Sequence, residues 1–277
     1  MLEARRMKRL GMIVMMVAAL LTVGCGGKHV ANQLVKQESK VEAKPVAVGL
    51  QASMAKAKVK KAARATKDEK KELSYNFKKP VPEGDKVKKS YFDDALFIGD
   101  SRTVGFLQCV DLKKATGYAS VGCLVNAALA QSVKLPDGTT TTVAKALKKE
   151  SFGKVYLMYG VNETGWNYTS QFVKRYRKLI RYVKKTQKDA TIYVQSIYPV
   201  SQKVSEQSKY ISNKRIRQYN KALQKLAAKE KVYFVNMAES VSNRQGALPK
   251  DAAVDGIHLR KKYCKRWLRY LRCHTVE

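Results

Sequence analysis

Beyond residue 90, short apolar runs alternate with longer runs in which apolar residues recur every three or four positions. The short runs have the length and near-continuous apolar character of buried strands, and we expect strands at 95–99, about 115–120, 154–159, 191–197 and 232–236. The longer runs are typical of amphipathic helices, and we expect these near 103–108, 139–150, 170–188, 212–230 and 260–272. The alternation predicts a parallel sheet flanked by helices, with functional residues just past the carboxyl ends of the strands.

Residues 26–90 have a different composition. They are rich in lysine, alanine and valine, contain Pro45, Pro80 and Pro82, and offer no wide apolar face. Such a segment buries too little surface to offset the entropy cost of ordering the chain. We therefore expect a lysine-rich flexible tether over 26–90 and one folded domain over 91–277.

The first 25 residues predict export. A basic segment at 5–9 precedes an apolar run at 10–23, which is too short for a comfortable membrane span. The run leads through Gly24 to Cys25, and this arrangement resembles a bacterial lipoprotein signal in which the cysteine is lipidated. An ordinary secretory signal or an uncleaved anchor would also export the chain.

The formal net charge of +33 attracts polyanions such as nucleic acid, anionic lipid or acidic wall polymer. Composition does not choose among them, but export argues against nucleic acid. We expect the tether to contact an anionic envelope polymer or lipid surface. The expected location is extracytoplasmic, with the lipid anchor holding the chain at the bacterial cell membrane.

Four cysteines follow Cys25, and they allow three disulfide pairings. Cys264 and Cys273 share an expected helix, which would hold them ~13 Å apart, too far for a bridge. Cys109 with Cys123 is an open pairing, although four free thiols are the favoured interpretation. Since no Cys/His cluster has the spacing of a metal site, we expect no metal and no other cofactor.

Ser101 stands in Gly99-Asp100-Ser101, between an expected strand and an expected helix. Glycine permits a tight turn, and a helix N-terminus stabilises a developing negative charge. Ser101 is therefore a candidate nucleophile. The alternative interpretation is that Asp100 and Ser101 serve only to cap the helix.

His258 is the one histidine expected in a structured crevice, because His29 lies in the tether and His274 lies near the C-terminus. Asp255 precedes it in a tight turn that can fold the carboxylate back onto the imidazole. A carboxylate there fixes the tautomer and stabilises the imidazolium. Asp251 is an alternative orienting group, and a surface-loop histidine is the alternative role for His258.

Two further residues follow strand ends. The side-chain amide of Asn162, in Gly160-Val161-Asn162, can donate a hydrogen bond to an oxyanion. Gly122, in Ser120-Val121-Gly122, can aim its backbone N–H into the same crevice. Simple turn formation is the other interpretation of Asn162.

These blocks, in this order, resemble those of the SGNH (GDSL-type) hydrolase family over residues 91–277. The matches are Gly99-Asp100-Ser101, Gly122 with Gly117 as a weaker candidate, Gly160-x-Asn162, and Asp255-x-x-His258. The family usually has an aspartate after the asparagine, where this chain has Glu163. The resemblance implies a flavodoxin-like three-layer α/β/α fold and a serine ester hydrolase.

It further implies catalysis by Ser101, His258 and Asp255, with an oxyanion hole formed by the N–H groups of Ser101 and Gly122 and the amide of Asn162. The expected substrate is an acylated carbohydrate or other ester of the cell envelope, which would lose an O-acetyl or other short acyl group. Acyl transfer on the same fold and a non-catalytic wall-binding role are the alternatives.

Several residues near the strand ends bear on the substrate. Arg102, beside the candidate nucleophile, would hold an anionic group or pair with an acidic neighbour. Four aromatic residues also lie near strand ends: Tyr159, Trp166, Tyr168 and Tyr198. They would either form a rim that stacks on sugar rings or pack in the core.

Overall fold

The computed structural model describes residues 75–276. Five strands form a parallel sheet in the order β2-β1-β5-β6-β7. Their bounds are Ala95–Gly99 (β1), Thr116–Ala119 (β2), Lys154–Met158 (β5), Thr191–Gln195 (β6) and Tyr233–Val235 (β7). All five residues of β1 are buried, as the continuous apolar run predicts. The five expected strands and the parallel sheet are confirmed.

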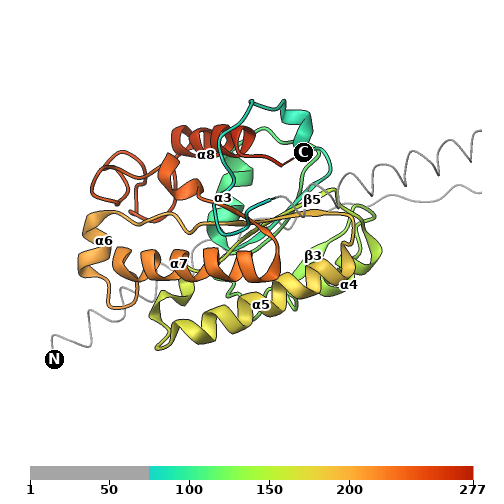
Figure 1. Ribbon diagram of the computed structural model, residues 1–277, viewed down its shortest axis with the longest axis horizontal. Helices are drawn as coiled ribbons and strands as arrows, with labels where there is room; N and C mark the ends of the chain where they lie inside the picture. The colour runs from blue at the N-terminus through green and yellow to red at the C-terminus, as the bar shows by residue number, and fades with distance from the viewer. Residues whose placement is uncertain (1–74, 277) are drawn as a thin grey trace, which may run out of the picture. The chain divides into compact units, whose positions relative to one another are not determined.

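Helices cover both faces of this sheet, so the three-layer α/β/α class is confirmed (Figure 1). One hydrophobic cluster packs α4 (Val143–Lys149), α5 (Thr169–Thr186) and α7 (Asn213–Glu230) against one face. A second cluster packs α3 (Ser101–Cys109) and α8 (Lys261–Cys273) against the other. The apolar stripe expected on α5 is buried, while lysines and arginines occupy the remaining surface.

The strand order reverses between β1 and β5. The chain passes from β1 to β2 on one side, and later returns to β5 on the other side of β1. Gly99 at the end of β1 lies opposite Ala119 in β2 and Met158 in β5, so the three strand ends are level. Parallel sheets bind ligands where the strand order reverses, just beyond the carboxyl ends. The loops after β1 and β5 therefore meet at the expected place for a site.

Some short elements were not predicted. The strands β3 (Ser132–Lys134) and β4 (Thr140–Thr142) form a hairpin. Because β4 occupies the first residues of the helix expected at 139–150, that helix begins later, at Val143. Four consecutive threonines favour extended backbone, and Gly138, with φ +83°, closes the turn. The short helix α6 (Gln202–Gln207) and the 3₁₀ turns η1 (Lys89–Phe92), η2 (Asn162–Gly165) and η3 (Met237–Ser240) were also not predicted.

The boundary expected at residue 90 is wrong, because residues 75–90 pack on the domain. The Val81 side chain is buried, and its N–H donates to the carbonyl of Phe234 at 2.8 Å. Gly84 and Val87 donate their N–H groups to carbonyls in the last turn of α8, at 2.7 and 2.9 Å. The prediction failed because it used the average composition of residues 26–90. This average is dominated by lysine and does not reflect the few apolar residues at 75–90.

Other expectations concern cysteines and the N-terminus. Cys264 and Cys273 do share α8, and the four cysteines within residues 75–276 are free, so Cys109 and Cys123 are not paired. Across the same residues, no helix has the length and apolar character to span a membrane, and no cluster of three ligating side chains forms a metal site. The signal segment, lipidation at Cys25 and the tether up to residue 74 lie outside the described residues.

Candidate active site

Ser101 is the first residue of α3, and a single residue, Asp100, separates it from the end of β1. Asp100 caps this helix, because its Oδ1 accepts the N–H of Arg102 at 2.9 Å. Burial raises the pKa of Asp100. A side chain at Gly99 would place its Cβ 2.8 Å from the carbonyl oxygen of Met158, so the turn requires glycine. The half-buried Ser101 side chain is thus held at a helix N-terminus beyond the sheet edge.

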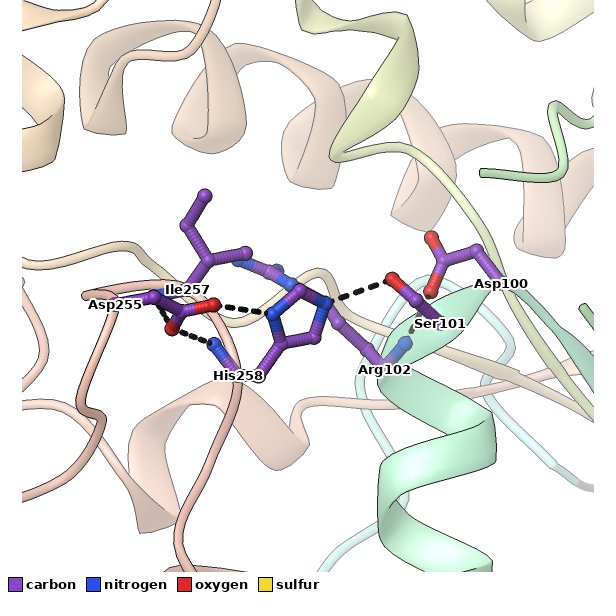
Figure 2. A network of polar contacts seen from close by, with 6 residues as sticks. All are labelled: Asp100, Ser101, Arg102, Asp255, Ile257 and His258. Atoms are coloured by element: carbon purple, nitrogen blue, oxygen red, sulfur yellow. Dashed lines mark hydrogen bonds and ion pairs between the residues drawn. The ribbon is translucent and has the colours of Figure 1, made fainter. Parts of the chain in front are cut away.

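Ser101, His258 and Asp255 form one hydrogen-bonded chain, although the serine is 157 positions from the histidine (Figure 2). The distance from Ser101 Oγ to His258 Nε2 is 2.8 Å. On the other side of the ring, His258 Nδ1 lies 2.6 Å from Asp255 Oδ2. With Nδ1 protonated toward the carboxylate, Nε2 is free to accept the serine proton. The structure therefore brings together the three residues selected from the sequence.

The turn at 255–258 fixes the carboxylate. Asp255 Oδ1 accepts the backbone N–H groups of Ile257 and His258, both at 2.8 Å. Partial burial acts to raise the pKa of Asp255, but the hydrogen bonds from the His258 ring and the two N–H groups hold that pKa below its usual range. Gly256 has a φ of +75°, which favours glycine. Asp255 is consequently ionised at neutral pH and oriented toward the imidazole.

Asp251, the alternative orienting group, is engaged elsewhere. Its carboxylate accepts the Tyr263 hydroxyl at 2.7 Å and the Lys262 ammonium at 3.1 Å. Both partners belong to the first turn of α8. Asp251 therefore anchors that helix and does not orient His258.

The Asn162 and Gly122 loops meet across the end of β1. Asn162 begins η2, and its Nδ2 donates to the carbonyl of Cys123 at 3.2 Å. Gly122, with φ +73°, stands in the turn that the Cys123 N–H closes onto Ser120 at 3.3 Å. Within residues 75–276, the backbone N–H groups of Ser101 and Gly122 donate to no acceptor. Since an amide nitrogen carries two protons, Asn162 also retains one for a ligand.

Glu163 is a component of the site that sequence reasoning recorded only as a departure from the family pattern. It is fully buried, and its Oε1 accepts the N–H of Val125 at 2.5 Å, so it ties the Gly122 loop to η2. Its Oε2 has no partner within the described residues. Burial raises the pKa of Glu163 to about 7, against the opposing effect of the Val125 N–H. Its position directly after Asn162 was the available clue.

We expect Glu163→Gln to change how stability depends on pH. The raised pKa means that the folded state binds this proton more tightly than the unfolded chain does. The free energy of unfolding therefore falls as the pH rises from about 4.5 to about 7, and it stays lower above pH 7. The decrease due to Glu163 is at most about 3 kcal/mol. Urea denaturation at pH 5 and pH 8 should show a smaller loss of unfolding free energy in Glu163→Gln than in the unmodified protein. Exposed Glu206→Gln is the control, and equal losses in all three proteins would contradict the prediction.

Two other candidates have structural roles. Arg102 does not face a ligand: it is 2% exposed, its Nη1 donates to the carbonyl of Tyr198 at 2.6 Å, and its guanidinium lies 3.9 Å from the centre of that ring. It links the start of α3 to the chain beyond β6.

Gly117 lies inside β2, where a side chain would collide with Leu107 on α3. Its lack of a side chain serves helix packing, so Gly122 is the glycine at the strand end.

The expected aromatic rim is only partly present. Tyr159 and Tyr198 are fully buried in the core, and half-buried Trp166 packs against it. Tyr168 is 64% exposed, and Tyr210, which sequence reasoning did not select, is 62% exposed. Tyr210 packs against η2, because a Cβ at Gly165 would lie 3.2 Å from its ring. Two tyrosines thus remain exposed: Tyr210 packs on η2, and Tyr168 follows η2 in the sequence.

Comparisons with known proteins agree with this fold. The sequence profile described as the GDSL-like lipase/acylhydrolase family matches residues 97–262. A search of curated proteins found no match. A Streptococcus pneumonia protein assigned as a platelet activating factor is similar in structure, with a TM-score of 0.53, 22% identity, and coverage of 79% of this chain and 97% of that chain. A Bacteroides fragilis protein assigned as an acylhydrolase has a TM-score of 0.49 at 15% identity, with 69% and 88% covered.

Proposed function

Because the chain belongs to the GDSL-like lipase/acylhydrolase family, whose members cleave esters, we propose that it is an esterase in which Ser101 is the nucleophile, His258 the general base and Asp255 its orienting carboxylate. The observation that carries this proposal is the continuous chain of short hydrogen bonds, 2.8 Å from Ser101 to His258 and 2.6 Å from His258 to Asp255 (Figure 2). A nucleophile, a base and an orienting group in hydrogen-bond contact constitute the general arrangement for acyl transfer through a covalent intermediate.

In the proposed mechanism, Ser101 Oγ attacks the ester carbonyl carbon while His258 Nε2 takes the hydroxyl proton. The carbonyl electron pair moves to oxygen, and Asp255 stabilises the imidazolium. The proton then passes to the departing alcohol oxygen as the carbon–oxygen bond breaks, leaving an acyl group on Ser101. Water, deprotonated by His258, attacks the acyl carbon of the acyl-enzyme. The bond from that carbon to Ser101 Oγ then breaks, Oγ takes the proton back from His258, and the carboxylic acid is released.

The developing oxyanion would lie among three donors, the N–H groups of Ser101 and Gly122 and the amide of Asn162. The first two N–H groups have no acceptor within residues 75–276, so they are available for this role. The N-terminus of α3 adds a favourable dipole at the same point. Donors already in place need no reorganisation when the negative charge forms.

We further propose that the substrate is a short acyl ester, such as an O-acetyl group, on a carbohydrate. The openness of the site supports this choice, since the His258 side chain is 45% exposed and a Cβ at Gly122 would meet open space. Such a site accommodates a small acyl group carried by a large alcohol. The exposed rings of Tyr168 and Tyr210 beside η2 are suited to contact with the faces of sugar rings.

For location, we propose export and lipid attachment at Cys25, which rests on the N-terminal sequence alone. In a bacterial host, the full chain should incorporate palmitate and sediment with membranes. Cys25→Ser should lose the label. Retention of the label by this variant would contradict attachment at Cys25.

A panel of esters tests the catalytic proposal. We expect hydrolysis of nitrophenyl acetate, slower hydrolysis of the octanoate, and release of acetate from an O-acetylated glycan without any added acceptor. A preference for octanoate would contradict the short-acyl assignment. Acetate release that requires an acceptor sugar would indicate acyl transfer, and no turnover of any ester would contradict esterase activity itself.

A further inference from the structure

A basic groove lies between α8 and the far end of α3. Its volume is about 590 Å³, and Lys86 and Lys89 contribute part of its lining. The cationic side chains that line it are Lys86, Lys89, Lys261, Lys265, Arg269 and Arg272. We name it the α8 groove. Residues 108–111 at the end of α3 also line it, whereas Ser101 starts that helix, about 12 Å away along its axis.

The positive charge in the α8 groove is mostly uncompensated. Asp111 is the single acidic residue among those lining it, and Asp111 is already paired with Lys89 at 3.2 Å. Lys86, Lys265 and Arg269 are exposed and have no ion-pair partner within residues 75–276. A concave surface with one sign of charge concentrates the field and attracts anions.

The spacing of the charges indicates a polymer. Lys261, Lys265 and Arg269 follow one another every four residues, so they line one side of α8 about 6 Å apart. Like charges at this spacing repel each other in the free protein. A single phosphate would neutralise only part of such a row, whereas a chain with regularly repeated negative charges can contact all three cations. We propose that the α8 groove binds a linear phosphodiester polymer that carries no bases.

Other polyanions fit the groove less well. Single-stranded nucleic acid is usually held by aromatic side chains that stack on bases, and no aromatic residue lines the groove. Peripheral membrane contact combines basic charge with exposed apolar side chains. In the described part of the chain, the large exposed apolar residues are elsewhere, in the loops beyond the carboxyl ends of the strands: Val121, Tyr168, Tyr210 and Val254.

A pair of charge-reversal variants tests the proposal in the full chain. The groove variant is Lys86→Glu, Lys265→Glu and Arg269→Glu, which changes both walls. The matched control is Lys174→Glu, Arg175→Glu and Lys178→Glu on exposed positions of α5, across the sheet. The two variants have the same composition of changes and the same net charge. The probe is purified poly(glycerol phosphate), with binding measured over a range of salt concentrations.

We expect the groove variant to bind at least about tenfold more weakly than the unmodified protein, and its salt dependence to fall by about 2 in the slope of log K against log salt. The control should change by less than about threefold. A second variant, Lys265→Gln with Arg269→Gln, removes two charges without reversing them and so perturbs folding less. It should lower the slope of log K against log salt by about 1.4. Turnover of nitrophenyl acetate should persist in all variants, so a failure of this inference is distinguishable from a failure of the proposed esterase.

Equal weakening of the groove and control variants would overturn the proposal, because diffuse attraction by net charge would then explain binding. Tighter binding to single-stranded oligothymidylate, or to vesicles of anionic phospholipid, than to poly(glycerol phosphate) would also overturn it in favour of those partners. An unchanged slope in the neutralised variant would show that these side chains do not contact the polymer.

Discussion

Ser101→Ala is expected to reduce kcat for nitrophenyl acetate by about 10⁴-fold or more, with a small change in KM. Removing the hydroxyl leaves His258 with no nucleophile to activate, although its 2.6 Å contact with Asp255 remains. The oxyanion donors would account for the residual rate. Initial-rate kinetics over a range of ester concentrations measures the change.

Labelling provides a second readout of the same variant. A fluorophosphonate should label the unmodified domain on one serine and should not label Ser101→Ala. Exposed Ser170→Ala, on α5, is the matched control and should behave as the unmodified protein does. Undiminished labelling or turnover in Ser101→Ala, with native circular dichroism, would refute the assignment of the nucleophile.

Asn162→Ala is expected to lower kcat by about 10²–10³-fold, since one oxyanion donor is lost. The effect should appear in kcat more than in KM, because the amide would bond the oxyanion more strongly than the ground-state carbonyl. The substitution also removes the 3.2 Å hydrogen bond to Cys123, so some of the loss would come from a displaced Gly122 loop.

Steady-state kinetics measures kcat and KM for Asn162→Ala and for Asn167→Ala, which serves as the control. The control shows how much of the decrease in kcat would follow from any asparagine-to-alanine change in this loop. Asn167 is exposed in the same connection between β5 and α5, and no hydrogen bond involves its side chain within residues 75–276. A kcat for Asn162→Ala within about threefold of the unmodified value would exclude a role in oxyanion stabilisation.

The strands and long helices were predictable from local periodicity. A strand buried on both faces must be continuously apolar, as β1 and β5 are, and a helix on a sheet must be apolar on one side, as α5 is. Residues 75–90 were not predictable in this way. Val81 is buried between two prolines, and Val87 is partly buried between two lysines, so neither belongs to a periodic apolar pattern. Their N–H groups donate to carbonyls of distant segments.

The reactive residues were accessible from sequence because strand ends and short turns limit where they can lie. Side-chain direction was not accessible. Tyr159 and Tyr198 follow strand ends as Tyr168 does, yet they turn into the core. Arg102 is adjacent to Ser101, but helix geometry directs it beneath the site and onto the Tyr198 ring. Such differences depend on which neighbour is available in three dimensions.

The hydrogen bonds from Gly84 and Val87 to the end of α8 have a practical consequence for recombinant work. The family profile ends at residue 262, two residues into α8, and begins inside β1. A fragment cut at those limits would lose most of α8, including Trp267, and would open the second core cluster to solvent. Expression boundaries for a catalytic fragment should therefore be placed no later than residue 75 and no earlier than residue 276.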